Sequence, residues 1–220
     1  MIKNKLGVTK ISLLKKEEER LSKQKAINFW LQENYKEIDF KNIDSLFVIH
    51  KILFEDIYDW AGKLREVNLS KGGFQFANTN FLEENLKRIN EMPVKTFEEI
   101  VEKYVEINIL HPFREGNGRS GRLWLDCLLL QELSIVLDWS KLDKEEYMFL
   151  MKESVKDSSQ LIIELENITT DDVNNREIFF KGLDFSYYYE EQYEYSSDEL
   201  AYEMETDLLD KEQENDERGV

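Results

Sequence analysis

The sequence predicts an all-α domain that carries one short β-hairpin, and three observations support this fold class. Prolines stand at only two positions of the chain, Pro93 and Pro112, so little interrupts a helix. Apolar residues recur at spacings of three and four over most segments, which is the period of a helix. One stretch, residues 65–76, alternates polar and apolar residues instead, which is the period of a strand.

The expected helices follow from this period and from signals at their ends. Thr96 and Glu99 have the spacing of a capping box and mark the start of one helix. That helix should end at His111, because the residue before a proline disfavours the α conformation. The run Leu123–Leu130 is apolar nearly all round and indicates a central buried helix. In chain order, helices are expected at residues 11–32, 42–60 (ended by Gly62), 81–90, 97–110, from 117 onward, 144–154, 158–167 and 171–189.

The hairpin is expected from two short alternating runs around a glycine-containing turn. The first run is residues 65–69, the turn is residues 70–73, and the second run is residues 74–76. A lone hairpin cannot form a core, so it must rest on the helices. It is either plain scaffolding or an edge to which an extended peptide adds as a strand. The residues offered for such target binding are Val67, Asn68, Leu69, Phe74, Gln75 and Phe76.

The charge of the chain is uneven. The net charge is −17, and residues 190–220 hold thirteen acids against Lys211 and Arg218, a net charge of −11. We therefore expect a globular body with an acidic tail. Sequence-independent binding to DNA or RNA needs clustered Lys and Arg, so no nucleic-acid partner is expected.

Other features of the composition indicate a cytoplasmic protein. The one cysteine, Cys127, lies in an apolar run and reads as a small buried hydrophobe, so no disulfide framework forms within one chain. No apolar segment follows the charged N-terminus, and no window approaches a membrane-spanning length. No membrane partner is therefore expected, while self-association into a homo-oligomer is left open.

One stretch, HPFREGNGRSGR at His111–Arg122, has the residue types of a phosphate site. Gly116 and Gly118 allow a tight loop whose amides, at the start of the next helix, can bind an anion. Arg119 and Arg122 are three apart and share a helical face. Their planar, permanently charged side chains suit a polyphosphate.

The other polar residues of the stretch fit the same chemistry. Glu115 would repel an anion unless a divalent cation such as Mg²⁺ lies between them. His111 can be neutral near pH 7 and accept a proton. A base, a metal-binding acid, a backbone cradle and two arginines equip a site for phosphoryl or nucleotidyl transfer. The plainer readings are a satisfied histidine and an ordinary ion-pair cluster; the second histidine, His50, lies in an apolar helix and takes the plain reading.

The stretch resembles the motif of the Fic family, HxFx(D/E)GNGRxxR, without any departure. The eight matching positions are His111, Phe113, Glu115, Gly116, Asn117, Gly118, Arg119 and Arg122, and chance gives such a match on the order of 10⁻¹⁰ per starting position. FEDIYDWAGKLR, Phe54–Arg65, also resembles the segment that leads into the Fic flap hairpin. The resemblance implies the Fic fold, a helical bundle with a β-hairpin flap. It divides the chain into an N-terminal helical extension packed on the domain (1–40), a Fic domain (41–185), an inhibitory helix (186–195) and the acidic tail (196–220).

The resemblance implies transfer of AMP from ATP to a hydroxyl side chain of a protein target held at the flap. It makes His111 the general base, Phe113 a core anchor, and Glu115 the ligand of Mg²⁺ (or Mn²⁺) across the α- and β-phosphates. It assigns the α-phosphate cradle to Gly116, Asn117 and Gly118, and the β- and γ-phosphates to Arg119 and Arg122. The related Doc branch, which phosphorylates its target, typically has Lys where Gly118 stands, so glycine here favours AMP transfer.

A second resemblance lies in SYYYEE, residues 186–191. One Fic subclass carries an inhibitory helix with the pattern (S/T)xxxE(G/N), and Ser186 and Glu190 match it while Glu191 departs. In that subclass the glutamate pairs with the second motif arginine, here Arg122, and keeps the γ-phosphate of ATP from its productive position. The plainer reading is a helix end before an acidic tail. Once that helix loosens, Tyr187, Tyr188 and Tyr189 are the expected self-modification sites.

Three functions compete at this point. The first is an AMP-transferring enzyme restrained by Glu190. The second is related chemistry, namely AMP removal, a bifunctional enzyme that adds and removes AMP, or transfer of another phosphate-containing group. The third is a binding module with a degenerate site, against which the intact motif argues.

Overall fold

The computed structural model describes residues 3–71 and 73–217, and its backbone is mostly helical, as predicted. The helices are α1 Ile11–Leu31, α2 Asp44–Phe54, α3 Leu82–Asn90, α4 Phe97–Leu110, α5 Asn117–Leu133, α6 Lys144–Glu153, α7 Ser159–Asn167, α8 Arg176–Tyr188 and α9 Ser197–Glu217. Short 3₁₀ turns lie at Asn34–Glu37, Thr79–Phe81 and Trp139–Lys141. No helix in these described ranges has the length and apolar character that crossing a membrane requires.

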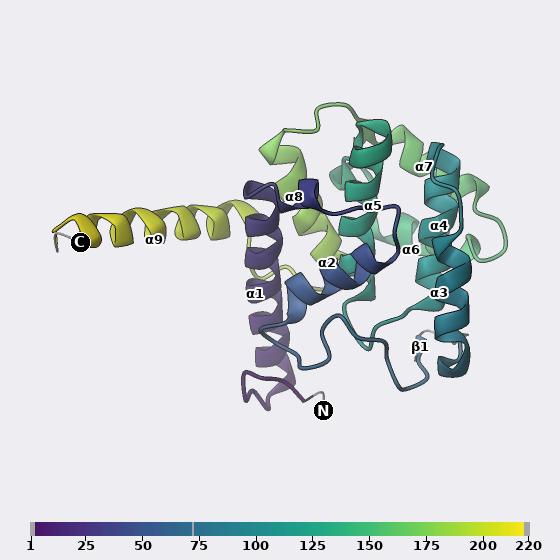
Figure 1. Cartoon of the computed structure of the whole chain (residues 1–220), viewed down its shortest axis with the longest axis horizontal. Helices are drawn as coiled ribbons and strands as arrows, with labels where there is room; N and C mark the ends of the chain where they lie inside the picture. Colours follow the sequence, from purple (N-terminus) through teal and green to yellow (C-terminus); the bar gives the residue numbers. More distant parts are fainter. Residues whose placement is uncertain (1–2, 72, 218–220) are drawn as a thin grey trace.

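Helix α5 is the centre of the fold, as its apolar run predicted. It packs against α2, α4 and α8, and Figure 1 shows it between them. Trp124, Leu125, Leu128 and Leu129 on α5 are completely buried. Burying such large apolar side chains contributes about 1.5–3 kcal/mol each, so the core anchors the helix whose first turns carry the second half of the motif.

The expected hairpin forms, but its ladder lies closer to the tip than predicted. Strands β1 Ser70–Lys71 and β2 Phe74–Gln75 pair antiparallel, with Ser70 opposite Gln75; Gly72, in the expected turn, lies outside the described residues. The prediction of a strand at residues 65–69 is wrong, apart from one bond from the Phe76 N–H to the Leu69 carbonyl at 3.1 Å.

Arg65 explains why residues 65–69 do not form a strand. Its side chain is buried and donates hydrogen bonds to the carbonyls of Val67, Ala77, Leu110 and His111. One guanidinium thus bonds two carbonyls that flank the hairpin and two at the end of α4, and it ties the flap to that helix. The Asn68 side chain also turns inward along the chain and accepts the Thr79 N–H at 2.9 Å.

A second strand pair was not predicted. β3 Val136–Leu137 pairs antiparallel with β4 Thr169–Thr170, beyond the C-terminal end of α5. Each strand has two residues, too few to show an alternating pattern. The pair is non-local, so no feature of either segment taken alone reveals it.

Two helix boundaries also differ from the prediction. The helix expected at 42–60 ends at Phe54, and the chain then turns until Gly62, whose positive φ of 70° suits glycine. The helix expected from 171 begins at Arg176, where the Asn175 side chain caps it by accepting two backbone N–H groups. The capping box of Thr96 and Glu99 is confirmed at the start of α4.

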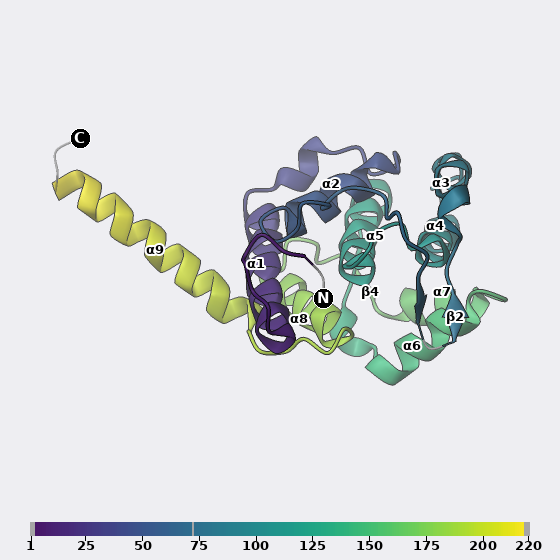
Figure 2. The same cartoon turned by 90° about the horizontal axis from the view of Figure 1, so that it is seen from below.

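The N-terminal helix and the acidic segment lie on the same side of the domain. Helix α1 packs against α2, α8 and α9. The acidic segment forms α9, whose first turn buries Leu200 and Ala201. The rest of α9 extends away from the body, as both views show (Figures 1 and 2).

Candidate active site

The motif forms a tight loop between α4 and α5. His111 ends α4 with a left-handed backbone, φ 49°, rather than the extended one expected before a proline. Phe113 is completely buried, and the Asn117 side chain closes the loop by bonding both the N–H and the carbonyl of Phe113, each at 2.8 Å. Gly116 has φ 78°, and a Cβ there would lie 2.4 Å from the Phe54 ring, so only glycine fits.

His111 faces the flap. Its ring stacks on Phe76, with centroids 3.8 Å apart and planes 16° from parallel. Burial lowers the pKa of His111 to about 4, so the imidazole is neutral at pH 7. A neutral ring beside a hairpin can accept a proton from a group presented by a bound chain.

Glu115 is the one acid of the loop and is half-exposed. Its Oε1 accepts the Gly116 N–H at 2.9 Å and lies 3.5 Å from Nη2 of Arg119. In the described part of the chain, no group of three His, Cys, Asp or Glu side chains could hold a metal alone. Mg²⁺ usually takes one or two carboxylates and completes its shell with substrate phosphates and water. Glu115 therefore fits an ion shared with a nucleotide and does not fit an all-protein metal centre.

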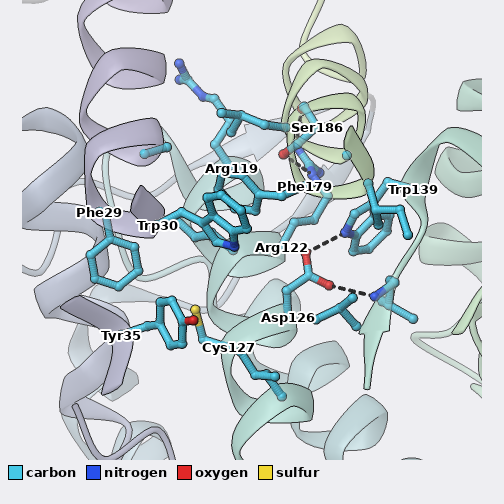
Figure 3. A pocket seen from close by; sticks show the side chains of 18 of the residues that line it. Phe29, Trp30, Tyr35, Arg119, Arg122, Asp126, Cys127, Trp139, Phe179 and Ser186 are labelled. Carbon is cyan, nitrogen blue, oxygen red and sulfur yellow. Dashed lines mark hydrogen bonds between the residues drawn. The ribbon is translucent and has the colours of Figure 1, made fainter. Parts of the chain in front are cut away.

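Arg122 is buried and engaged by the segment that follows the body of the domain. It donates from Nε to Ser186 Oγ at 2.8 Å, and from Nη2 to the Ser186 carbonyl at 2.6 Å and to Glu190 Oε1 at 3.2 Å. Figure 3 shows Ser186 of α8 beside Arg122 of α5. The residues matched by the inhibitory pattern thus contact the arginine that the resemblance assigned to them.

The Glu190 carboxylate lies in the cradle itself. A Cβ on Gly118 would fall 2.2 Å from Glu190 Oε1, so a side chain at position 118 cannot coexist with this contact. Burial would raise the pKa of Glu190, but Arg122, Lys71 and Arg119 outweigh it and lower the pKa to about 2. Lys71, on β1 of the flap, approaches Glu190 Oε2 at 3.4 Å.

Arg119 and Arg122 have different hydrogen-bond partners in this structure. It is buried and donates to Glu18 Oε1 at 2.7 Å and to Gln192 Oε1 at 2.9 Å. Glu18, on α1, also accepts a hydrogen bond from Tyr58. Burial opposes its ionisation, yet Arg119 and these hydrogen bonds leave the pKa of Glu18 lowered. The two motif arginines therefore belong to two separate ion-pair clusters.

The three tyrosines have different environments. Tyr187 and Tyr189 are buried, and their hydroxyls donate to Ser22 Oγ and to the Leu142 carbonyl. Tyr188 is exposed. In this conformation only Tyr188 of the three offers a hydroxyl for modification.

Sequence reasoning missed several residues that shape the site. They are Glu18, His50, Arg65, Lys71 and Gln192. The two rings of His50 and Phe113 stack with centroids 3.8 Å apart, and burial lowers the pKa of His50 to about 4. His50 is a satisfied buried residue, as expected, but one of its hydrogen-bond partners, the Glu115 carbonyl, is on the motif loop. Apart from Arg65, which ends the segment Phe54–Arg65 that resembles the lead into the flap, none of these residues belongs to a pattern that marked it.

Comparisons with known proteins place the chain among proteins of one family. The sequence profile of the Fic/DOC family matches residues 40–129. Protein adenylyltransferase VbhT of Bartonella schoenbuchensis is 32% identical over 155 residues, covering 64% of this chain and 32% of that protein. Probable protein adenylyltransferase Fic of Escherichia coli K12 is 32% identical over 118 residues, covering 49% of this chain and 58% of that protein. The chain thus spans from about a third to somewhat over half the length of these relatives.

Solved structures share the fold. The crystal structure of the effector protein BepC from Bartonella tribocorum, with bound AMPPNP, matches with a TM-score of 0.65 and 21% identity over 77% of this chain and 92% of that chain. The N-terminal Fic domain of a Bep effector from Bartonella sp. AR 15-3 matches with a TM-score of 0.66 and 23% identity over 78% and 88%. At this identity the likeness concerns the fold alone.

Proposed function

The chain belongs to the Fic/DOC family, and from this premise we propose that it is a protein adenylyltransferase that transfers AMP from ATP to a hydroxyl side chain of a target protein. The main observation behind the proposal is the intact motif loop, with neutral His111 facing the flap hairpin and Gly118 adding no side chain of its own to the cradle. The relatives named protein adenylyltransferase support the same reaction.

The proposed reaction uses the loop residues in distinct roles. The target hydroxyl attacks the α-phosphorus of ATP, the bond from that phosphorus to the pyrophosphate breaks, and His111 takes the hydroxyl proton. The loop amides of Asn117 and Gly118 stabilise the charge on the α-phosphate, while the Gly116 N–H holds Glu115 Oε1. Glu115 would hold Mg²⁺ (or Mn²⁺), which supplies charge neutralisation on the phosphates when bound. Arg122 binds the terminal phosphate once Glu190 leaves it.

The proposed binding place of the target is the flap. Phe76 already stacks on His111, so a chain paired with the hairpin passes beside the base. The main-chain groups of β1 and β2 suit strand addition, in which backbone bonds supply affinity. Val67 and Asn68 lie outside the ladder, so we place the docking edge nearer the tip, with Leu69, Phe74, Gln75 and Phe76.

Autoinhibition by Glu190 is part of the proposal. A carboxylate that contacts Arg122 and Gly118 occupies the space and neutralises the charge that ATP phosphates need.

The enzyme works where ATP is supplied, which assigns it to the cytoplasm. Its target protein is a partner of the flap, and the segment 186–191 acts as its restraint.

A second candidate activity is removal of AMP, alone or alternating with transfer. The position of an ionised Glu190 beside the cradle favours it, because a carboxylate there can activate water against an AMP-modified hydroxyl. The product of that reaction is free AMP and the restored hydroxyl.

The deciding experiment incubates the wild type, Glu190→Gly, and Glu190→Gly with His111→Ala with ATP labelled at the α- or the γ-phosphate. AMP transfer places the α-label alone on protein in the Glu190→Gly variant and none in the double variant. Incorporation of the γ-label means phosphate transfer instead. Release of labelled AMP from pre-modified protein by the wild type, but not by Glu190→Gly, identifies the removal activity.

A further inference from the structure

His50, outside the motif, has both ring nitrogens hydrogen-bonded, one to the motif loop and one to the turn at Gly62. Nδ1 lies 2.8 Å from the backbone nitrogen of Gly62, which donates its hydrogen to the ring. Nε2 lies 2.9 Å from the carbonyl oxygen of Glu115. The residue is completely buried, so water does not compete for either bond.

These two partners determine the tautomer of His50. A neutral imidazole has one donor nitrogen and one acceptor nitrogen. Because Nδ1 accepts from Gly62, the proton is on Nε2, and Nε2–H donates to the Glu115 carbonyl. The ring also stacks on Phe113 with planes 23° apart, which leaves it no freedom to rotate away from these bonds.

The Glu115 carbonyl belongs to the same peptide unit as the Gly116 N–H. A peptide unit is planar, so holding its carbonyl fixes the direction of its N–H. That N–H donates to Oε1 of the Glu115 side chain at 2.9 Å. The hydrogen bond from His50 therefore fixes the orientation of the 115–116 peptide plane, and the Gly116 N–H of that plane holds the Glu115 carboxylate.

We propose that His50 is a positioning residue for the reaction, which aims the Glu115 carboxylate at the metal–nucleotide complex by holding the 115–116 peptide plane. This inference rests on the proposed function. An apolar residue could fill the same space and stack on Phe113, so packing alone does not account for a histidine with both nitrogens bonded. The bond from Gly62 fixes the orientation of the imidazole ring. The bond to the Glu115 carbonyl then fixes the peptide plane relative to the ring.

Two substitutions separate the two bonds. In His50→Gln the amide can donate near the position of Nε2, which retains the bond to the Glu115 carbonyl and loses the acceptor for Gly62. In His50→Asn the amide oxygen lies near the position of Nδ1, which retains the acceptor for Gly62 and loses the donor to Glu115. His50→Phe keeps the ring and loses both bonds.

The readouts are the affinity of the protein–ATP complex for Mn²⁺, measured by electron paramagnetic resonance, the rate of AMP transfer in a Glu190→Gly background, and Tm. We expect His50→Asn and His50→Phe to weaken Mn²⁺ binding about tenfold, as loss of one buried hydrogen bond does. His50→Gln should stay within about threefold of the parent, although its Tm falls as much as that of His50→Asn. Mn²⁺ affinity that follows Tm across the three variants, or that is equal for Gln and Asn, overturns the inference.

A measurement on the unsubstituted ring covers the case in which a variant does not fold. The chain has two histidines, so His111→Ala leaves His50 as the only imidazole for ¹⁵N NMR. We expect a protonated Nε2 whose signal shifts when Mg²⁺ and ATP are added together, and a protonated Nδ1 or an unchanged signal refutes the inference. A parent that binds Mn²⁺ and ATP but transfers no AMP contradicts the proposed function and leaves this readout intact.

Discussion

Replacing Glu190 with glycine should release Arg122 and raise AMP transfer. In the structure Glu190 Oε1 lies 3.2 Å from Arg122 Nη2, and the arginine side chain is only 3% exposed. The substitution removes this carboxylate and leaves the two bonds from Arg122 to Ser186 in place. The arginine thus keeps its position but gains a free donor for a phosphate.

The size of the effect follows from that one contact. A hydrogen bond between charged groups contributes about 1.5–3 kcal/mol. The lowered pKa of Glu190, to which Arg122 is the largest favourable contributor, agrees in direction with this contact. The Lys71 contact adds little, because that side chain is 65% exposed. ATP should therefore bind about ten- to a hundredfold more tightly to Glu190→Gly.

The pH of the assay does not confuse this comparison. A carboxylate whose pKa is lowered in the folded state stabilises it fully above the ordinary value of 4.5 and loses that contribution as pH falls toward 2. At pH 7 the wild-type contact is complete. The difference between the two proteins then reports the whole contact.

The assay combines calorimetric titration of Mg²⁺–ATP with mass spectrometry of the protein after incubation with ATP and Mg²⁺. A matched control is Glu191→Gln, which removes the adjacent acid, an exposed group 3.8 Å from Lys144. We expect tighter ATP binding and added AMP, including on Tyr188, in Glu190→Gly alone. Equal ATP affinity and equally low AMP incorporation in all three proteins would mean that residues 186–191 are not a restraint.

Three further predictions concern single residues. Glu191 has a left-handed backbone, φ 61°, at the position where the inhibitory pattern has Gly or Asn. Glu191→Asn should therefore relieve about 1 kcal/mol of strain and raise Tm by about 2–4 °C. An unchanged Tm in calorimetry argues against strain there. Burial lowers the pKa of His111 to about 4, so in the Glu190→Gly background kcat/KM for AMP transfer should hold constant from pH 8 down to about pH 5, and an acid limb centred near pH 6.5 contradicts a neutral buried base. Losing a neighbour of a metal ligand typically costs about 10- to 100-fold in metal affinity, so Glu115→Gln should raise the Mg²⁺ needed for half-maximal transfer at least as much, and full activity in EDTA would exclude the metal role.

The helical body was predictable because its signals are local. The capping box of Thr96 and Glu99, the apolar surround of α5 and the turn at Gly62 each lie within a few residues of the structure they determine. The errors occur where a distant residue decides. Residues 65–69 alternate like a strand. However, Arg65 donates hydrogen bonds to the carbonyls of Leu110 and His111, which hold the segment against the end of α4 and outside the strand pair. Tertiary hydrogen bonds override a pattern of only five residues.

The candidate site was predictable for the same reason, and only to the same extent. Its loop is contiguous in sequence, so a motif can specify it. The residues that orient the loop come from far along the chain. Glu18 and Gln192 lie 101 and 73 positions from Arg119, and His50 lies 65 positions from Glu115. In an acidic chain, no local sequence signal indicates which acid will pair with a particular arginine.

Arg119 and Arg122 share a helical face but have different acidic partners in this structure. Two residues three apart share a helical face, and from this the sequence predicted a common polyphosphate ligand. In the fold, however, α1 lies on one side of that face and the end of α8 on the other, and each offers its own acid. Arg119 is 2% exposed with Glu18 at 6%, whereas Glu190, the partner of Arg122, is 22% exposed. Breaking a fully buried pair by removing one partner costs about 3–5 kcal/mol, so exchange of a carboxylate for a phosphate is far easier at Arg122. We therefore expect Arg122 to respond to ATP before Arg119, whose pair with Glu18 is the more deeply buried of the two.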